Sequence, residues 1–149
     1  MNRRFGEDDW QPIEVRVRDD YAGALAAYGV YDVLLVNPIF DGMNLVAMEG
    51  PMLNRRGGVL VLSRNAGAYW RLGKHAIAIN PFDVQETADA LAEALEMPRE
   101  QRVRRARNLS RLVLTNPPEK WVRSQLEDLQ RAAVRRAAAG ARAGSKPLA

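Results

Sequence analysis

Short apolar runs alternate with longer segments of helical spacing along the first hundred residues. Runs rich in branched apolar residues lie at 32–36, 59–62 and 76–79. Such runs, bounded by turn residues, are typical of buried strands. Pro12–Val17 alternates apolar and polar residues, which predicts a further short strand. Strands that alternate with helices in this way indicate an α/β fold with a parallel sheet.

Capping and breaking residues set the expected helix boundaries. The expected helices are 20–28, one from about 43 to 50, a short one ending near 72, then 84–97, 98–114 and one beginning at 118. Gly29 should end the first helix. Pro51 should kink or stop the second near Gly50, because proline lacks an N–H and clashes with the carbonyl four residues earlier.

Charge divides the chain into parts. Residues 1–97 form the α/β part, 98–131 add C-terminal helices to it, and we expect the Ala/Arg-rich stretch 132–149 to be a disordered tail. The net charge is +4, but residues 99–149 hold 13 basic and 4 acidic side chains, a balance of +9. The remaining residues, 1–98, carry a balance of −5, so the basic character belongs to the C-terminal segment.

The basic helix expected at 98–114 raises one alternative function, a nucleic-acid-binding module. Its run of arginines comprises Arg99, Arg102, Arg104, Arg105, Arg107 and Arg111. These charges spread around the helix, however, and few aromatic residues interleave to stack on bases. We therefore favour a solvated basic face and expect no nucleic-acid partner.

Composition excludes several other classes of protein. The absence of cysteine excludes disulfides and thiolate metal sites. The single histidine, His75, excludes multi-histidine zinc sites, so we expect no metal. No apolar run approaches the roughly 20 residues that span a bilayer, and the N-terminus lacks the apolar core of a signal peptide. These features predict a cytoplasmic protein without a membrane partner.

The loop after the run 32–36 is the candidate binding site. In parallel sheets ligands bind at the carboxyl ends of strands. Asp41 and Gly42 are turn residues, and the helix that follows presents N–H groups that can receive a phosphate. Gly42 lets the backbone come close to a ligand. Glu49 shares a helix face with Leu45 and is placed to accept hydrogen bonds from sugar hydroxyls.

Each of these residues also has a purely structural interpretation. Asp41 could serve as a turn former, Asn44 as a helix cap, and Glu49 as a charge that complements the helix dipole.

The run Asp-Gly-Met-Asn-Leu-Val-Ala-Met-Glu at 41–49 resembles the donor-binding motif of trehalose-6-phosphate synthases. These are retaining glycosyltransferases with two Rossmann-like lobes. The resemblance continues at 32–38, 58–68 and 79–83, and covers roughly residues 2–130. Met48 stands where the family usually has lysine, and we expect its side chain to face away from the donor.

The resemblance implies a role for each motif residue. Asp41 would be the catalytic-site residue that hydrogen-bonds the donor glucose. Glu49 would bind the ribose hydroxyls of the nucleotide. The backbone amides that would hold the sugar and diphosphate are those around Gly42, Met43, Asn44 and Leu45. The donor would be UDP-glucose or GDP-glucose, which the sequence does not decide, and no cofactor is implied.

The resemblance also implies that parts are missing. Family members place an arginine and a lysine on the donor diphosphate from an earlier segment, and bind the acceptor with an N-terminal lobe that nothing here matches. We therefore expect a partial doubly wound, Rossmann-like sheet: the C-terminal lobe of a two-lobe glycosyltransferase, followed by C-terminal helices. Such a chain would be catalytically incomplete by itself. Glucose 6-phosphate would be its acceptor only if the missing lobe is supplied.

Three alternatives stay open at this point. Glucosylglycerol-phosphate and validoxylamine-phosphate synthases are close variants of the same scaffold. The chain could also be a non-catalytic partner of a full-length synthase, or a remnant of one. In the doubly wound order 3-2-1-4-5-6 it would hold strands 3 to 6, leaving the strand at 32–36 with a bare apolar edge. Since bare edges pair with other chains, we expect weak stability or self-association.

Overall fold

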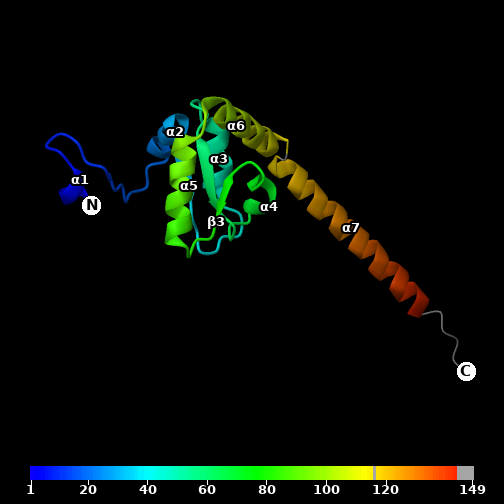
Figure 1. Ribbon diagram of the computed structural model, residues 1–149. Coiled ribbons are helices and arrows are strands. Elements are labelled where there is room, and N and C mark those ends of the chain that lie inside the picture. Colours follow the sequence, from blue (N-terminus) through cyan, green and yellow to red (C-terminus); the bar gives the residue numbers. More distant parts are fainter. Residues whose placement is uncertain (116, 144–149) are drawn as a thin grey trace, which may run out of the picture.

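Three parallel strands form the sheet of this protein, whose computed structural model describes residues 1–115 and 117–143 (Figure 1). They are β1 (Val33–Val36), β2 (Val59–Ser63) and β3 (Ile77–Ile79), in the spatial order β1-β2-β3. Val33 pairs with Val59, and Val61 with Ile77. The α/β fold with a parallel sheet is confirmed.

The central strand β2 carries the core. All five of its residues are buried. Side chains of a strand alternate between faces, so Leu60 and Leu62 join one apolar cluster, and Val59 and Val61 join another. The strand β2 is a continuous run of apolar residues from Val59 to Leu62 because helices cover both faces of the sheet.

Helices cover both faces. On the face of Leu60, α3 (Leu45–Leu53), α4 (Tyr69–Leu72) and α6 (Arg99–Leu114) pack through residues that include Ala47, Leu72 and Leu109. On the opposite face lies α5 (Val84–Glu96), through Ala90 and Ala94. A further helix, α2 (Tyr21–Val30), packs against α3.

Three side-chain caps fix where helices begin. Asp20 accepts a hydrogen bond from the N–H of Gly23 at 2.9 Å, and Asp83 from that of Glu86 at 2.9 Å. Asn44 caps α3 in the same way. These bonds satisfy N–H groups that have no partner within the helix.

The strand expected at Pro12–Val17 is absent. This segment is extended but unpaired, and Val15 and Val17 are 74% and 91% exposed. Alternation makes a strand only where a neighbour offers hydrogen bonds and an apolar face, and the described chain places none beside it. The residues before it include a short helix, α1 (Asn2–Phe5).

Two helices run past the residues expected to end them. Gly29 lies inside α2, because residues 54–56 satisfy the carbonyls at the end of this helix: the N–H of Arg55 donates to the Gly29 carbonyl at 3.1 Å. Pro51 lies inside α3, which continues to Leu53, and the carbonyl of Gly50 accepts from the N–H of Asn54 at 3.0 Å. The expected stop near Gly50 is therefore wrong.

The last helix, α7 (Pro118–Ala143), projects away from the body, as does the N-terminal segment (Figure 1). Residues 132–143, part of the stretch expected to be a disordered tail, belong to this helix, and alanine and arginine are strong helix formers. The rest of that tail, 144–149, lies outside the described residues. Apolar side chains on α7, among them Trp121 and Leu129, are 64% and 66% exposed.

The strand β1 lies at the edge of the sheet, as expected, and its Leu35 is 40% exposed. Within the described residues, no strand pairs with its outer side. No helix among the described residues is long and apolar enough to cross a membrane.

Candidate functional site

Two loops meet at the carboxyl end of the sheet. The loop 37–44 follows β1, and the loop 64–68 follows β2. The N–H of Asp41 donates to the carbonyl of Asn65 at 3.3 Å, and the N–H of Gly67 donates to the carbonyl of Asp41 at 2.9 Å. Asp41 and Ala66 thus form an isolated parallel bridge that extends the β1–β2 pairing. The candidate loop is held by its neighbour along most of its length.

Asn65 and Gly67 make this junction possible. The side-chain amide of Asn65 donates to the carbonyl of Ile39 at 2.8 Å. A Cβ atom at Gly67 would collide with the carbonyl oxygen of Gly42, so only glycine fits there. Neither residue was predicted to support the site. The sequence feature that could have identified them is the polar, glycine-containing loop 64–68, which directly follows the strand β2.

Asp41 is fixed by hydrogen bonds within its own loop. Its Oδ1 accepts from the N–H of Met43 at 3.0 Å, and its Oδ2 accepts from the side-chain amide of Asn44 at 3.0 Å. The interpretation of Asp41 as a turn former is therefore confirmed. A carboxylate has about four acceptor positions, so these two bonds orient the group and leave it capacity for sugar hydroxyls.

Asn44 is the cap of α3. Its Oδ1 accepts from the N–H of Ala47 at 2.9 Å, and its φ of +73° lies in the left-handed region, which asparagine tolerates better than most residues. The capping interpretation is confirmed. Among the described residues, no recorded hydrogen bond engages the N–H groups of Leu45 and Val46. They stand at the positive end of the α3 dipole.

Glu49 lies one turn after Leu45, which is 61% exposed. The Glu49 side chain is half-buried near Tyr28 of α2: burial, and then the charge of Glu49, raise the pKa of the Tyr28 hydroxyl. Met48, the departure from the family pattern, packs against the core cluster that includes Ala47. It faces the protein interior, where a lysine would need a partner for its charge.

The cation in the second loop, Arg64, forms an ion pair outside the candidate site. Arg64 makes a two-pronged ion pair with Glu86 of α5, at 2.5 and 3.2 Å. The hydrogen bond and charge of Arg64 lower the pKa of Glu86. Because Arg64 is drawn toward α5, it is not placed to meet a diphosphate at the start of α3.

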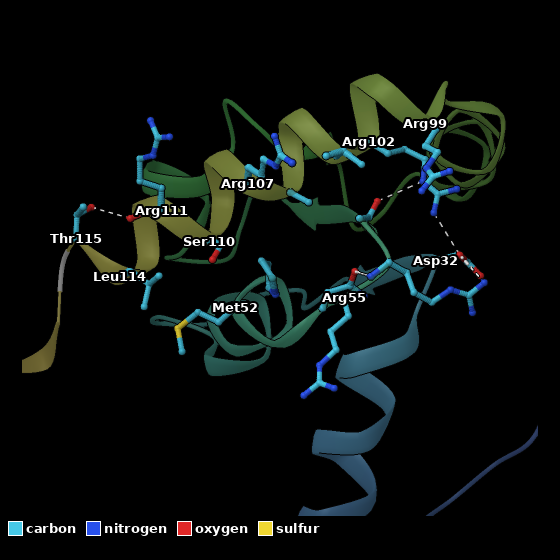
Figure 2. A pocket seen from close by; sticks show the side chains of 16 residues that line it. Asp32, Met52, Arg55, Arg99, Arg102, Arg107, Ser110, Arg111, Leu114 and Thr115 are labelled. Carbon is cyan, nitrogen blue, oxygen red and sulfur yellow. Dashed lines mark hydrogen bonds and ion pairs between the residues drawn. The ribbon is translucent and has the colours of Figure 1, made fainter.

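The pronounced cavity of Figure 2 lies away from these loops. It measures about 1090 Å³ and lies between α6 and the segment from Pro51 to Gly57. Asp32, which immediately precedes β1, binds Arg102 at 3.2 Å and Arg56 at 3.4 Å on its wall. None of the predicted site residues from Asp41 to Glu49 lines it.

A comparison of the sequence with known protein families identifies the family of this chain. The sequence model of glycosyltransferase family 20 matches residues 1–131. This chain belongs to glycosyltransferase family 20. The resemblance to trehalose-6-phosphate synthases, stated above from the motif at 41–49, is confirmed, and so is the enzyme class of its family.

Similar family-20 proteins are far longer than this chain. The probable UDP-forming alpha,alpha-trehalose-phosphate synthase 2 of Arabidopsis thaliana is 42% identical over 123 residues, which are 81% of this chain and 15% of the relative. The trehalose-6-phosphate synthase of Sinorhizobium fredii is 39% identical over 132 residues, or 87% of this chain and 28% of the relative. The chain therefore spans less than a third of these relatives.

Solved family-20 structures share the fold. The UDP-forming alpha,alpha-trehalose-phosphate synthase of Burkholderia vietnamiensis superposes with a TM-score of 0.81 at 36% identity, over 91% of this chain and 30% of that one. The corresponding Burkholderia xenovorans enzyme, in complex with glucose-6-phosphate, superposes with a TM-score of 0.79 at 39% identity, over 87% and 29%. The fold is thus part of the glycosyltransferase architecture.

Proposed function

We propose that this chain is the donor-binding part of a trehalose-6-phosphate synthase. The complete enzyme would transfer glucose from a nucleotide-glucose to glucose 6-phosphate, in trehalose biosynthesis. The names of the relatives support UDP-glucose as the donor, since they are UDP-forming synthases. One solved relative holds glucose-6-phosphate, which supports the acceptor.

One observation supports this proposal: three groups suited to binding a nucleotide sugar follow β1 within the nine residues 41–49. The Asp41 carboxylate is oriented by two hydrogen bonds, the first N–H groups of α3 face outward, and Glu49 follows one turn later. Together they offer acceptors for sugar and ribose hydroxyls and donors for a diphosphate.

The arrangement assigns distinct tasks to these groups. The amides at the start of α3 would bind the diphosphate, whose negative charge grows as the glycosidic bond breaks, and preorganised donors stabilise such charge. Asp41 would hold the glucose ring through its hydroxyls. Glu49 would fix the ribose, away from the phosphates that it repels. Gly42, where an added Cβ meets no protein atom within 4 Å, would let a ligand approach the backbone.

The proposal separates binding from turnover. Because the chain spans less than a third of its relatives, we expect binding of the donor nucleotide without glucosyl transfer by the isolated chain. Transfer would require the remaining part of the architecture. A remnant or a non-catalytic partner would share the binding and lack the transfer.

Calorimetric titration with UDP and with GDP tests the proposal. The chain should bind UDP, and Glu49→Ala should weaken binding by about tenfold or more, the effect of losing hydrogen bonds to a charged group. Glu93→Ala on the outer face of α5 is a matched control and should bind as the unmodified chain does. A folded chain that binds neither nucleotide, or binds equally after Glu49→Ala, would contradict the assignment.

A further inference from the structure

The exposed side of α6 carries a stripe of arginines, of which Arg107 and Arg111 also line the cavity of Figure 2. Arg104, Arg107 and Arg111 follow one another at intervals of three and four residues, which places them on one side of the helix. All three are exposed. Among the described residues, no recorded hydrogen bond or ion pair engages their side chains. Figure 2 shows Arg107 and Arg111 projecting from α6 on the side opposite Met52.

The outer face of α5 carries a matching acidic stripe. Asp89, Glu93 and Glu96 follow one another at intervals of four and three residues, and all are exposed. Asp89 accepts a hydrogen bond from the side-chain amide of Gln85 at 2.8 Å. This amide is neutral, so the bond does not offset the negative charge of the stripe. The inner face of α5 is occupied by the sheet, since Ala90 and Ala94 are buried there.

The two stripes are complementary in spacing as well as in charge. If the helices lie antiparallel, Asp89 meets Arg111, Glu93 meets Arg107, and Glu96 meets Arg104. The intervals then agree at every step, four residues and then three on both helices.

The stripes cannot meet within one chain. The helix α6 packs through Leu109 on the face of the sheet that carries Leu60, and α5 packs on the face that carries Val59. Alternate residues of a strand point to opposite faces, so the sheet separates the two helices. One chain can therefore reach the complementary stripe only on a second copy.

We propose that α5 of one copy docks antiparallel on α6 of a second copy, through the ion pairs Asp89–Arg111, Glu93–Arg107 and Glu96–Arg104. Each copy keeps one stripe free after pairing, so the contact is head-to-tail and can add further copies. Exposed ion pairs are individually weak and are screened by salt. The association is thus reversible, favoured at high protein concentration and low ionic strength.

Sedimentation velocity over a range of concentrations tests this contact. In about 20 mM salt the chain should associate, and in about 500 mM salt the dissociation constant should rise about tenfold or more, because the Debye length falls well below 10 Å. Two triple variants disrupt one stripe each. The first combines Arg104→Glu, Arg107→Glu and Arg111→Glu; the second combines Asp89→Lys, Glu93→Lys and Glu96→Lys.

Each variant alone should sediment as a monomer in low salt, because its two stripes then carry the same sign. An equimolar mixture should associate again, since each variant presents the stripe that the other lacks. The changes are confined to exposed positions, and unchanged thermal melting would confirm that the fold persists. A matched control reverses Arg123, Arg131 and Arg135 on α7, with the same change in net charge, and should leave the association intact.

Three results would overturn the proposal: a monomer at every concentration in low salt, association that neither variant weakens, or association that high salt does not weaken. The last of these would point instead to pairing at the free edge of β1. None of these readouts uses nucleotide, so their outcome is independent of the donor site.

Discussion

The backbone carbonyl of Asp41 accepts a hydrogen bond from the N–H of Gly67 at 2.9 Å, which joins the loop after β1 to the loop after β2. The candidate donor site is therefore not one flexible loop. It is a junction whose geometry depends on the contact between two neighbouring strands. Substitutions in the second loop should disturb the first, although they replace none of the residues assigned to the donor.

Gly67→Ala should damage this junction. The added methyl group collides with the carbonyl oxygen of Gly42, and because that contact is with backbone, one loop must move. We expect a loss of about 1–3 kcal/mol in the free energy of unfolding. Urea unfolding followed by circular dichroism measures it, and the displacement of Asp41 should also weaken UDP binding.

Gly42→Ala is the matched control on the other side of the junction. A Cβ atom at Gly42 meets no protein atom within 4 Å, so stability should change by no more than about 0.5 kcal/mol. UDP affinity should nevertheless fall, because the methyl group enters the space proposed for the ligand. If Gly42→Ala destabilised the fold as much as Gly67→Ala, the described junction would be wrong.

Asn44 should be replaceable by glycine more easily than by alanine. Asn44→Ala removes the cap on the N–H of Ala47 and forces alanine into a φ of +73°, so we expect a cost of about 1–2 kcal/mol. Asn44→Gly loses the cap but suits this backbone, and should cost less. Thermal melting of the two variants side by side gives the order, and equal melting temperatures would argue against strain at this position.

The local parts of this site could be predicted from the sequence, and the parts that depend on pairing could not. Asp41, Asn44 and Glu49 lie within nine residues of one another, where turn chemistry and helical spacing decide their placement. The contribution of Gly67 depends on which strand lies beside β1, which spacing along the chain does not reveal. Nucleotide binding at any of these residues stays a prediction.

The same distinction explains the errors in the fold. Pro12–Val17 has the alternation of a strand, yet it is unpaired, because pairing needs a neighbour and not only a pattern. Gly29 is typical of a helix end, but α2 continues past it. Residues from a distant segment donate hydrogen bonds to the carbonyls at the end of this helix: the Asn54 amide donates to the Tyr31 carbonyl at 2.9 Å. Local signals set the kinds of elements, and tertiary contacts set their ends.

Tyr31→Phe should stabilise the protein. The Tyr31 hydroxyl is buried without a recorded hydrogen-bond partner among the described residues, and an unsatisfied buried group is unfavourable. Its removal should raise the free energy of unfolding by about 1 kcal/mol at pH 8, as measured by urea unfolding. Tyr21→Phe, at a side chain that is 69% exposed, is the matched control and should change stability little.

Tyr31→Phe should also reduce the decline in the free energy of unfolding that occurs at alkaline pH. Burial raises the pKa of Tyr31 above its ordinary value, so the folded state keeps the phenol proton after the unfolded chain releases it. The stabilisation linked to that proton is complete below a pH of about 10, the ordinary tyrosine pKa, and declines as the pH rises further. Unfolding measured from pH 8 to 11 should show a shallower decline for Tyr31→Phe; parallel curves would mean that Tyr31 does not titrate differently in the two states.

On mild heating, the free edge of β1 should drive association of a kind that salt does not weaken. Within the described residues no strand covers this edge, and Leu35 on it is 40% exposed. Edge pairing uses backbone hydrogen bonds and apolar burial, neither of which is screened, and a lysine on an edge opposes it. We therefore expect Leu35→Lys to reduce light scattering on mild heating in 500 mM salt, where the contact between α5 and α6 is suppressed. Lysine at Val122, 47% exposed on α7, is the matched control. If Leu35→Lys scattered as strongly as this control, an interaction other than edge pairing would hold the copies together, and the exposed apolar stripe of α7 would be the next surface to substitute.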